Sequence, residues 1–121
     1  MIKRSLVTLV DDDESVRESL PDLLKEFGYA VRVFATAEEF LASDALARTA
    51  CLILDVAMPG MTGPELQREL QRRGSLVPIV FITAQRDETI RARLIADGAV
   101  ECVFKPFSDT DLQAALDAAF P

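Results

Sequence analysis

Histidine is absent from this 121-residue sequence, and its absence excludes several kinds of chemistry at once. Histidine is the commonest metal ligand and the side chain best suited to act as a general base near neutral pH. Without it, neither serine–histidine nor cysteine–histidine catalysis is available. Any metal site in this chain must therefore be built mainly from oxygen ligands or from its few thiols.

Long apolar runs and cysteines are also scarce. No run approaches the roughly 20 apolar residues of a membrane span, and no signal peptide precedes the first predicted strand. The two cysteines, Cys51 and Cys102, are typical of a chain kept in a reducing compartment. We therefore expect a cytoplasmic protein that does not enter a membrane.

Positive charge is in short supply as well. The chain has 13 lysines and arginines against 20 aspartates and glutamates, which gives a formal net charge of −7. Proteins that bind nucleic acid directly need a basic footprint to hold the phosphate backbone. We therefore expect no direct nucleic-acid binding by this domain; the negative charge suits solubility, or a site that concentrates cations.

What the sequence does contain is a repeated alternation of short apolar runs and longer amphipathic stretches. The runs predict five strands, at Leu6–Val10, Ala30–Phe34, Cys51–Leu54, Ile79–Ile82 and Val100–Phe104. Helices are predicted between and after them, over Glu14–Phe27, Ala37–Ala47, Gly63–Arg73, Asp87–Asp97 and Asp109–Phe120. The runs are continuous, as in strands covered on both faces, so the pattern predicts an α/β fold with a parallel sheet. No linker or repeat interrupts it, and we expect one domain over residues 1–121.

Polar and charged side chains collect where four of these five strands end. They are Asp11-Asp12-Asp13, Asp55, Thr83-Ala84 and Lys105-Pro106. In open α/β sheets, ligands bind outside the carboxyl ends of the strands, where the strand order reverses. If the first and third strands are neighbours, the carboxylates, the hydroxyl and the ammonium face one crevice.

Each of these residues also has an ordinary structural explanation. Asp13 can cap the following helix, Asp55 can be a turn residue, Thr83 a β-branched strand end and Lys105 a solvated lysine. One helix cap needs one acid, however, and three follow the first strand. The recurrence of such residues at four separate strand ends favours a functional site.

The chemistry of this set points to a metal ion and a phosphoryl group. Carboxylates held close together repel one another, so one must take a proton or a cation must bind. Oxygen ligands alone, with room for water, favour Mg²⁺ over Ca²⁺. Asp55 could act as a nucleophile towards a phosphoryl group, whose oxygens Mg²⁺ and Lys105 would neutralise while the Thr83 hydroxyl hydrogen-bonds one of them.

Four motifs carry a family resemblance that covers essentially the whole chain. They are LVDDDESVR, LILDVAMPGMTG, VFITA and CVFKPF, in this order and spacing. Together they closely resemble the receiver domain of bacterial two-component response regulators. The resemblance implies a flavodoxin-like, doubly wound five-stranded sheet with strand order 2-1-3-4-5 and five helices. It also implies a signalling module and not an enzyme.

The resemblance assigns a role to each residue of the predicted site. Asp55 matches the phosphoacceptor, and Asp11 and Asp12 match the acidic pair that holds Mg²⁺. Asp12 and Asp55 would be direct ligands and Asp11 would act through water, with the backbone carbonyl of Ala57 as the remaining protein ligand. Thr83 matches the switch hydroxyl. Lys105 matches the lysine that pairs with the phosphate, and its bond to Pro106 is one that is usually cis in this family.

The same resemblance implies the partners. A histidine kinase would supply the phosphoryl group, because this chain has no histidine to be the donor and no G-x-x-x-x-G-K loop to bind ATP. Phosphorylation would draw Thr83 inward and alter the surface made by the last two helices and the strand between them. An output domain or effector protein would read that surface, with transcription as the expected output. A phosphorylation-linked homodimer is a further form of partner that this family allows.

Three positions depart from, or vary within, the family pattern. Cys102 stands where similar receivers usually have a tyrosine or phenylalanine whose rotamer reports phosphorylation, and a thiol cannot swing between buried and exposed positions as such a ring does. Ala57 and Gln85 occupy the positions that tune the lifetime of the phosphoryl group. Ala57 has no side chain to orient an attacking water, and we expect slow loss of phosphate.

Alternative interpretations remain open from the sequence. The same fold could be a phospho-independent protein-binding module, which the intact set of site residues argues against. A Mg²⁺-dependent phosphatase with an aspartyl intermediate needs a second acid two residues after the nucleophile, where this chain has Ala57. The chain could be a stand-alone regulator or part of a longer one, and the closing proline, typical of a linker, favours the longer protein.

Overall fold

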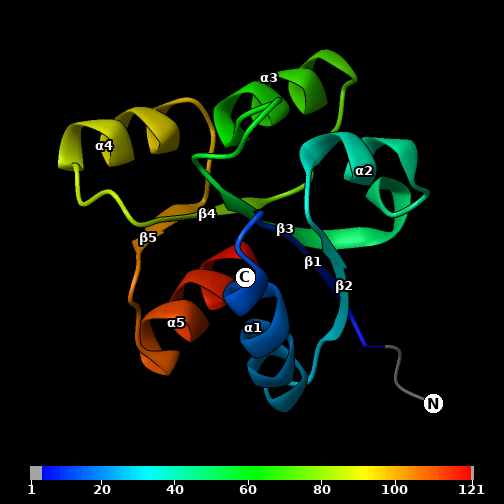
Figure 1. The fold of residues 1–121 in the computed structure, drawn as a ribbon, viewed down its shortest axis with the longest axis vertical. Helices are drawn as coiled ribbons and strands as arrows, with labels where there is room; N and C mark the ends of the chain where they lie inside the picture. Colours follow the sequence, from blue (N-terminus) through cyan, green and yellow to red (C-terminus); the bar gives the residue numbers. More distant parts are fainter. Residues whose placement is uncertain (1–3, 121) are drawn as a thin grey trace.

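The computed structural model describes residues 4–120 (Figure 1). Within those residues, five parallel strands form one sheet in the order β2-β1-β3-β4-β5. Their bounds are β1 Leu6–Val10, β2 Ala30–Phe34, β3 Thr49–Asp55, β4 Ile79–Thr83 and β5 Glu101–Phe104. The predicted fold class and strand order are confirmed, and β1 and β3 are neighbours as the predicted site requires.

Helices cover both faces of this sheet. They are α1 Glu14–Glu26, α2 Ala37–Ala42, α3 Gly63–Arg72, α4 Glu88–Ala96 and α5 Asp109–Ala119. Figure 1 shows α1 and α5 on one side of the strands and α2, α3 and α4 on the other. Among the described residues, no helix combines the length and the apolar character needed to cross a membrane.

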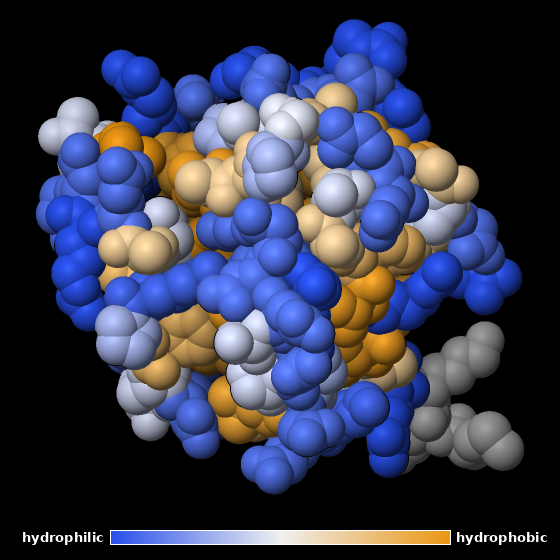
Figure 2. All heavy atoms as spheres, in the orientation of Figure 1, coloured by the Kyte–Doolittle hydropathy of each residue, from blue (hydrophilic) through white to orange (hydrophobic). Residues whose placement is uncertain are grey.

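Two hydrophobic cores, one on each face of the sheet, account for the continuous apolar runs. Successive side chains of a strand point to opposite faces. In β3, Cys51 and Ile53 pack in the core under α1 and α5, whereas Leu52 and Leu54 pack in the core under α2, α3 and α4. A strand buried on both faces thus needs apolar residues at every position. On the face drawn in Figure 2, hydrophilic residues cover much of the surface.

The second predicted helix, Ala37–Ala47, was too long. Helix α2 ends at Ala42, and a short 3₁₀ helix, η1, follows at Leu46–Arg48. Ser43 takes an extended backbone, its hydroxyl donates to the Phe40 carbonyl at 2.7 Å, and its oxygen accepts from the Ala45 amide at 3.1 Å. Such local side-chain hydrogen bonds compete with helix continuation, which is why a serine ends α2.

A close approach at Gly63 joins the end of β3 to the start of α3. The Gly63 amide donates to the Val56 carbonyl at 3.0 Å. A Cβ atom at Gly63 would lie 2.3 Å from the Asp55 carbonyl oxygen, far inside van der Waals contact. Only glycine allows α3 to begin this close to the last residue of β3, so Gly63 helps to fix the backbone of Asp55.

Candidate functional site

Asp11 is the most deeply fixed acid of the site. It follows β1 directly, is fully buried, and its amide donates to the Phe34 carbonyl of β2 at 3.1 Å. One carboxylate oxygen, Oδ1, accepts from the Asp13 amide at 2.9 Å, and the other, Oδ2, accepts from the Lys105 ammonium at 2.9 Å. Every polar atom of its side chain therefore has a partner, as burial of a charge requires.

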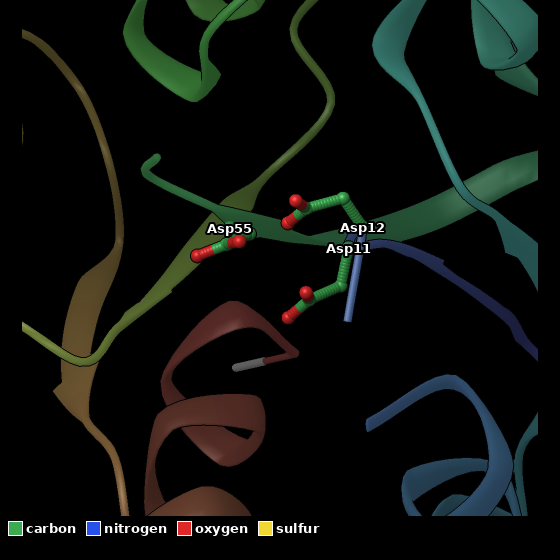
Figure 3. A group of neighbouring side chains, drawn as sticks. All are labelled: Asp11, Asp12 and Asp55. Atoms are coloured by element: carbon green, nitrogen blue, oxygen red, sulfur yellow. The ribbon is translucent and has the colours of Figure 1, made fainter. Parts of the chain in front are cut away.

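Three carboxylates converge at the carboxyl ends of β1 and β3. One ligand oxygen each of Asp11, Asp12 and Asp55 lies within 4.8 Å of the others. Figure 3 shows the three carboxyl groups gathered beside the end of β3, with the Asp12 side chain above and the Asp11 side chain below in this view. Asp55 is the last residue of β3 and is buried, whereas Asp12 is exposed. The predicted juxtaposition is confirmed, because residues far apart in the sequence meet at one edge of a parallel sheet.

Lys105 and Thr83 reach the same place from β5 and β4. The Lys105 ammonium lies 3.7 Å from Oδ1 of Asp55, and the Lys105 backbone amide donates to the Thr83 carbonyl at 2.7 Å. The Lys105–Pro106 peptide bond is cis, as the family resemblance implied. Thr83 is buried at the end of β4, and its hydroxyl oxygen accepts from the Gln85 amide at 3.1 Å.

These residues surround an open cavity of about 420 Å³. It is lined by Asp12, Asp13, Asp55, Ala57, Thr83, Ala84, Gln85 and Lys105. Asp11 is not part of this lining: it lies behind, and touches Lys105 from below the surface. The cavity thus brings together every predicted site residue except Asp11, whose buried carboxylate holds the Lys105 ammonium from behind.

Sequence reasoning missed the roles of two residues, one in the wall of this cavity and one behind it. Asp13 was interpreted as a helix cap, and it does accept from the Ser15 amide at 2.8 Å, but it also lines the cavity. Arg17 donates from Nη1 to the backbone carbonyl of Asp11 at 3.0 Å. A basic residue so near the positive end of a helix is unusual, and that was the signal in the sequence.

The crowding of acids changes the protonation of Asp55. Burial raises the pKa of the Asp55 carboxyl to about 7, with help from the negative charges of Asp11 and Asp12, although the Lys105 ammonium opposes the change. Burial alone would lower the pKa of Lys105, but its contacts with Asp11 and Asp55 outweigh that effect and raise it. Lys105 therefore stays charged, and one ammonium does not neutralise three carboxylates.

The donor set fits a hard divalent cation. Among residues 4–120, no lysine or arginine forms an ion pair with Asp12, which faces the cavity beside Asp55. Ala57 follows Asp55 by two residues and lines the same cavity. Carboxylate and carbonyl oxygens with open space for water are the ligands that Mg²⁺ prefers, and the described part of the site has no sulfur or nitrogen ligand to favour a softer ion.

Cys102 lies elsewhere, beside a second cavity of about 370 Å³ between α4, β5 and α5. Its side chain is buried, and burial raises the pKa of its thiol to about 11, so it is a small core residue. Phe104, two residues further along β5, lines the same cavity, and the Arg86 guanidinium lies 5.8 Å from the centre of its ring. Cys51 is buried on the opposite face of the sheet, and both cysteines are free.

Comparison with known proteins gives the family. Residues 7–117 match the model of the response regulator receiver domain. The chain is 40% identical over 116 residues to nodulation protein W of Bradyrhizobium diazoefficiens, and the match covers 96% of this chain and 51% of that protein. It is 39% identical over 115 residues to transcriptional regulatory protein TdiR of Thauera aromatica, with 95% of this chain and 51% of that protein covered.

The fold agrees with the sequence match. The structure of FixJ-N aligns with a TM-score of 0.87 and 36% identity, over 98% of this chain and 94% of that one. The chain spans about half the length of the curated relatives it matches. The acidic crevice, the strand order and these matches lead to one conclusion: the chain belongs to the family of response regulator receiver domains.

Proposed function

We propose that residues 1–121 form one receiver domain in which Asp55 accepts a phosphoryl group from a histidine kinase. A carboxylate oxygen of Asp55 would attack the phosphorus atom of a phosphohistidine. The new O–P bond forms as the N–P bond breaks, and the imidazole of the kinase keeps the electron pair and is protonated. The observation that carries this proposal is the position of Asp55, buried at the end of β3 yet open to the cavity.

The acids around Asp55 would hold Mg²⁺. Asp12 and Asp55 would bind it directly, Asp11 would act through water, and the Ala57 carbonyl would be the last protein ligand. The convergence of three carboxylate oxygens within 4.8 Å supports this assignment. When bound, the ion would neutralise part of the charge on the transferring phosphoryl group. It would also offset the burial and the repulsion from Asp11 that raise the pKa of Asp55.

Lys105 and Thr83 would act on the other phosphoryl oxygens. The Lys105 ammonium lies 2.9 Å from Asp11 and 3.7 Å from Asp55, so it can turn towards a new negative group on Asp55 without leaving Asp11. The Thr83 hydroxyl accepts from the Gln85 amide, which leaves its hydrogen to donate to a phosphoryl oxygen. Ala84, next to it in the cavity wall, leaves space for that group.

The output would be regulation of a partner through the surface of α4, β5 and α5. TdiR is a transcriptional regulatory protein and is about twice as long as the matched region, which supports transcription as the output and an output domain as the first partner to test. A phosphorylation-linked homodimer belongs to the same proposal. Slow loss of phosphate, because Ala57 has no polar side chain, and a cytoplasmic location stay predictions from the sequence.

Phosphorylation by a small-molecule phosphodonor tests this proposal. We expect intact-protein mass spectrometry to show one phosphoryl adduct that needs Mg²⁺ and is abolished in Asp55→Asn. Asp22→Asn, which removes an exposed acid from the middle of α1, is the control and should be labelled like the wild type. An adduct on Asp55→Asn would overturn the assignment. Repeated turnover with release of phosphate would favour a phosphatase, and no adduct at all would favour a phospho-independent module.

A further inference from the structure

Arg17 has an unusual position in α1. It is the fourth residue of the helix, and its own amide donates to the Asp13 carbonyl at 3.1 Å. Helical side chains lean towards the N-terminus, so the Arg17 guanidinium extends back past the start of α1. There Nη1 donates to the backbone carbonyl of Asp11 at 3.0 Å, in a half-buried contact.

Helix electrostatics alone do not explain a cation at this point. The N-terminal end of a helix carries a partial positive charge, so basic residues are favoured at the other end, where Lys25 stands in α1. The three acids before the helix, Asp11 to Asp13, offset this cost for Arg17. Its guanidinium therefore interacts with the acidic turn that precedes the helix, where it bonds to the Asp11 carbonyl.

The bond that Arg17 makes fixes one particular peptide unit. The Asp11 carbonyl belongs to the planar peptide that links Asp11 to Asp12. The Asp11 amide and carboxylate are already held by Phe34, Asp13 and Lys105. The Asp11 carbonyl is the one polar group of this residue that those three partners do not hold. Its direction fixes the plane of the Asp11–Asp12 peptide, and with it the direction in which the exposed Asp12 side chain leaves the backbone.

We propose that Arg17 is a positioning residue for the metal site, which holds the Asp11–Asp12 peptide so that the Asp12 carboxylate faces Asp55. This inference rests on the proposed function of that site. Arg17 touches neither the ion nor the phosphoryl group; it acts through the backbone of a neighbouring acid. Its removal has two effects of opposite sign, since losing a positive charge favours cation binding and losing the tether disfavours it.

Calorimetric titration of the full chain with Mg²⁺ separates these effects. Arg17→Met keeps most of the apolar stem and removes both the charge and the donor. We expect it to weaken Mg²⁺ binding about tenfold, the lower end of the range for groups that orient metal ligands. Arg17→Lys, which keeps the charge without the planar fork, should also bind more weakly than the wild type. Lys25→Ala, which removes a cation from the far end of the same helix, should bind like the wild type.

A second readout does not involve the metal. In the Mg²⁺-free protein, the amide resonance of Asp12 should shift in Arg17→Met and stay in place in Lys25→Ala. Tighter or unchanged Mg²⁺ binding by a folded Arg17→Met would overturn the positioning role and leave the metal site intact. A wild-type chain that binds no Mg²⁺ would instead overturn the proposed metal site itself.

Discussion

The acidic cavity and the cavity beside Cys102 are built in different ways. Around the acidic cavity, buried charges have fixed partners: Asp11 is held by three other residues through its amide and carboxylate, and Lys105 lies between two acids. Beside the second cavity, Cys102 is a small apolar residue next to open space. The charged residues around it are half-buried, as Arg91 and Glu101 are, or exposed, as Arg86 and Asp111 are.

This difference in construction suits the two cavities to different roles. The acidic cavity is formed by strand ends, so its side chains are set by the sheet and tolerate little change in shape. The second cavity is formed by the sides of α4 and α5 over β5, where a larger or smaller residue at position 102 changes the surface but not the sheet. Phosphoryl chemistry would be common to the family, whereas the surface read by a partner would be particular to this chain.

Gly63→Ala should give the largest effect, because it breaks the close packing behind the acidic cavity. The new Cβ atom would meet the Asp55 carbonyl at 2.3 Å, so the start of α3 must move away from β3. We expect a loss of about 3 kcal/mol in the free energy of unfolding. Urea denaturation measures it, and a variant as stable as the wild type would show that this end of β3 is not tightly packed.

Asp55→Asn should give the second-largest effect, a gain in the free energy of unfolding, when it is measured in a buffer with a metal chelator. The pKa of Asp55 is raised to about 7 in the folded protein, whereas it is near 4 in the unfolded chain. The wild type is therefore most stable below pH 4 and loses stability as the pH rises from 4 through 7. The asparagine variant lacks this loss. We expect it to be more stable than the wild type by about 2 kcal/mol at pH 8 and similar to it at pH 4.

Thermal or urea unfolding at both pH values measures this difference. Saturating Mg²⁺ should reduce the advantage at pH 8, because a bound cation stabilises the ionised carboxylate of the wild type. Equal stabilities of the two proteins across the whole pH range would mean that neither burial nor the neighbouring acids raise the pKa of Asp55.

Cys102→Leu, beside the second cavity, should give the smallest effect. The cavity of about 370 Å³ beside Cys102 can take the larger side chain without moving the sheet. We expect a change below about 1 kcal/mol in unfolding free energy and an unchanged yield of the Mg²⁺-dependent phosphoryl adduct. A large loss of that adduct would show that the two cavities are coupled through β5.

The sheet and the main site were predictable from the sequence for a physical reason. A parallel strand covered on both faces must be apolar throughout, and its carboxyl end must lie beside those of its neighbours. The positions of Asp12, Asp55, Thr83 and Lys105 follow from these two rules once β1 and β3 are known to be adjacent.

What escaped prediction depends on single hydrogen bonds that leave no periodic signal. Ser43 ends α2 through its own hydroxyl, although the apolar pattern continues beyond it. Arg17 reaches the Asp11 carbonyl through a long side chain whose direction is set only in three dimensions. The space beside Cys102 likewise depends on how α4 and α5 sit on β5, which the residue types alone do not determine.

The most direct test of Asp55 as the phosphoacceptor is to locate the phosphoryl group on the chain. After phosphorylation with Mg²⁺, borohydride reduction converts an aspartyl phosphate to homoserine, and peptide mass spectrometry then identifies the position. We predict homoserine at position 55 alone, and none when Mg²⁺ is removed by a chelator. Homoserine at position 11, 12 or 13 in place of position 55 would contradict the role of Asp55, and labelling that does not depend on Mg²⁺ would contradict the role of the metal ion.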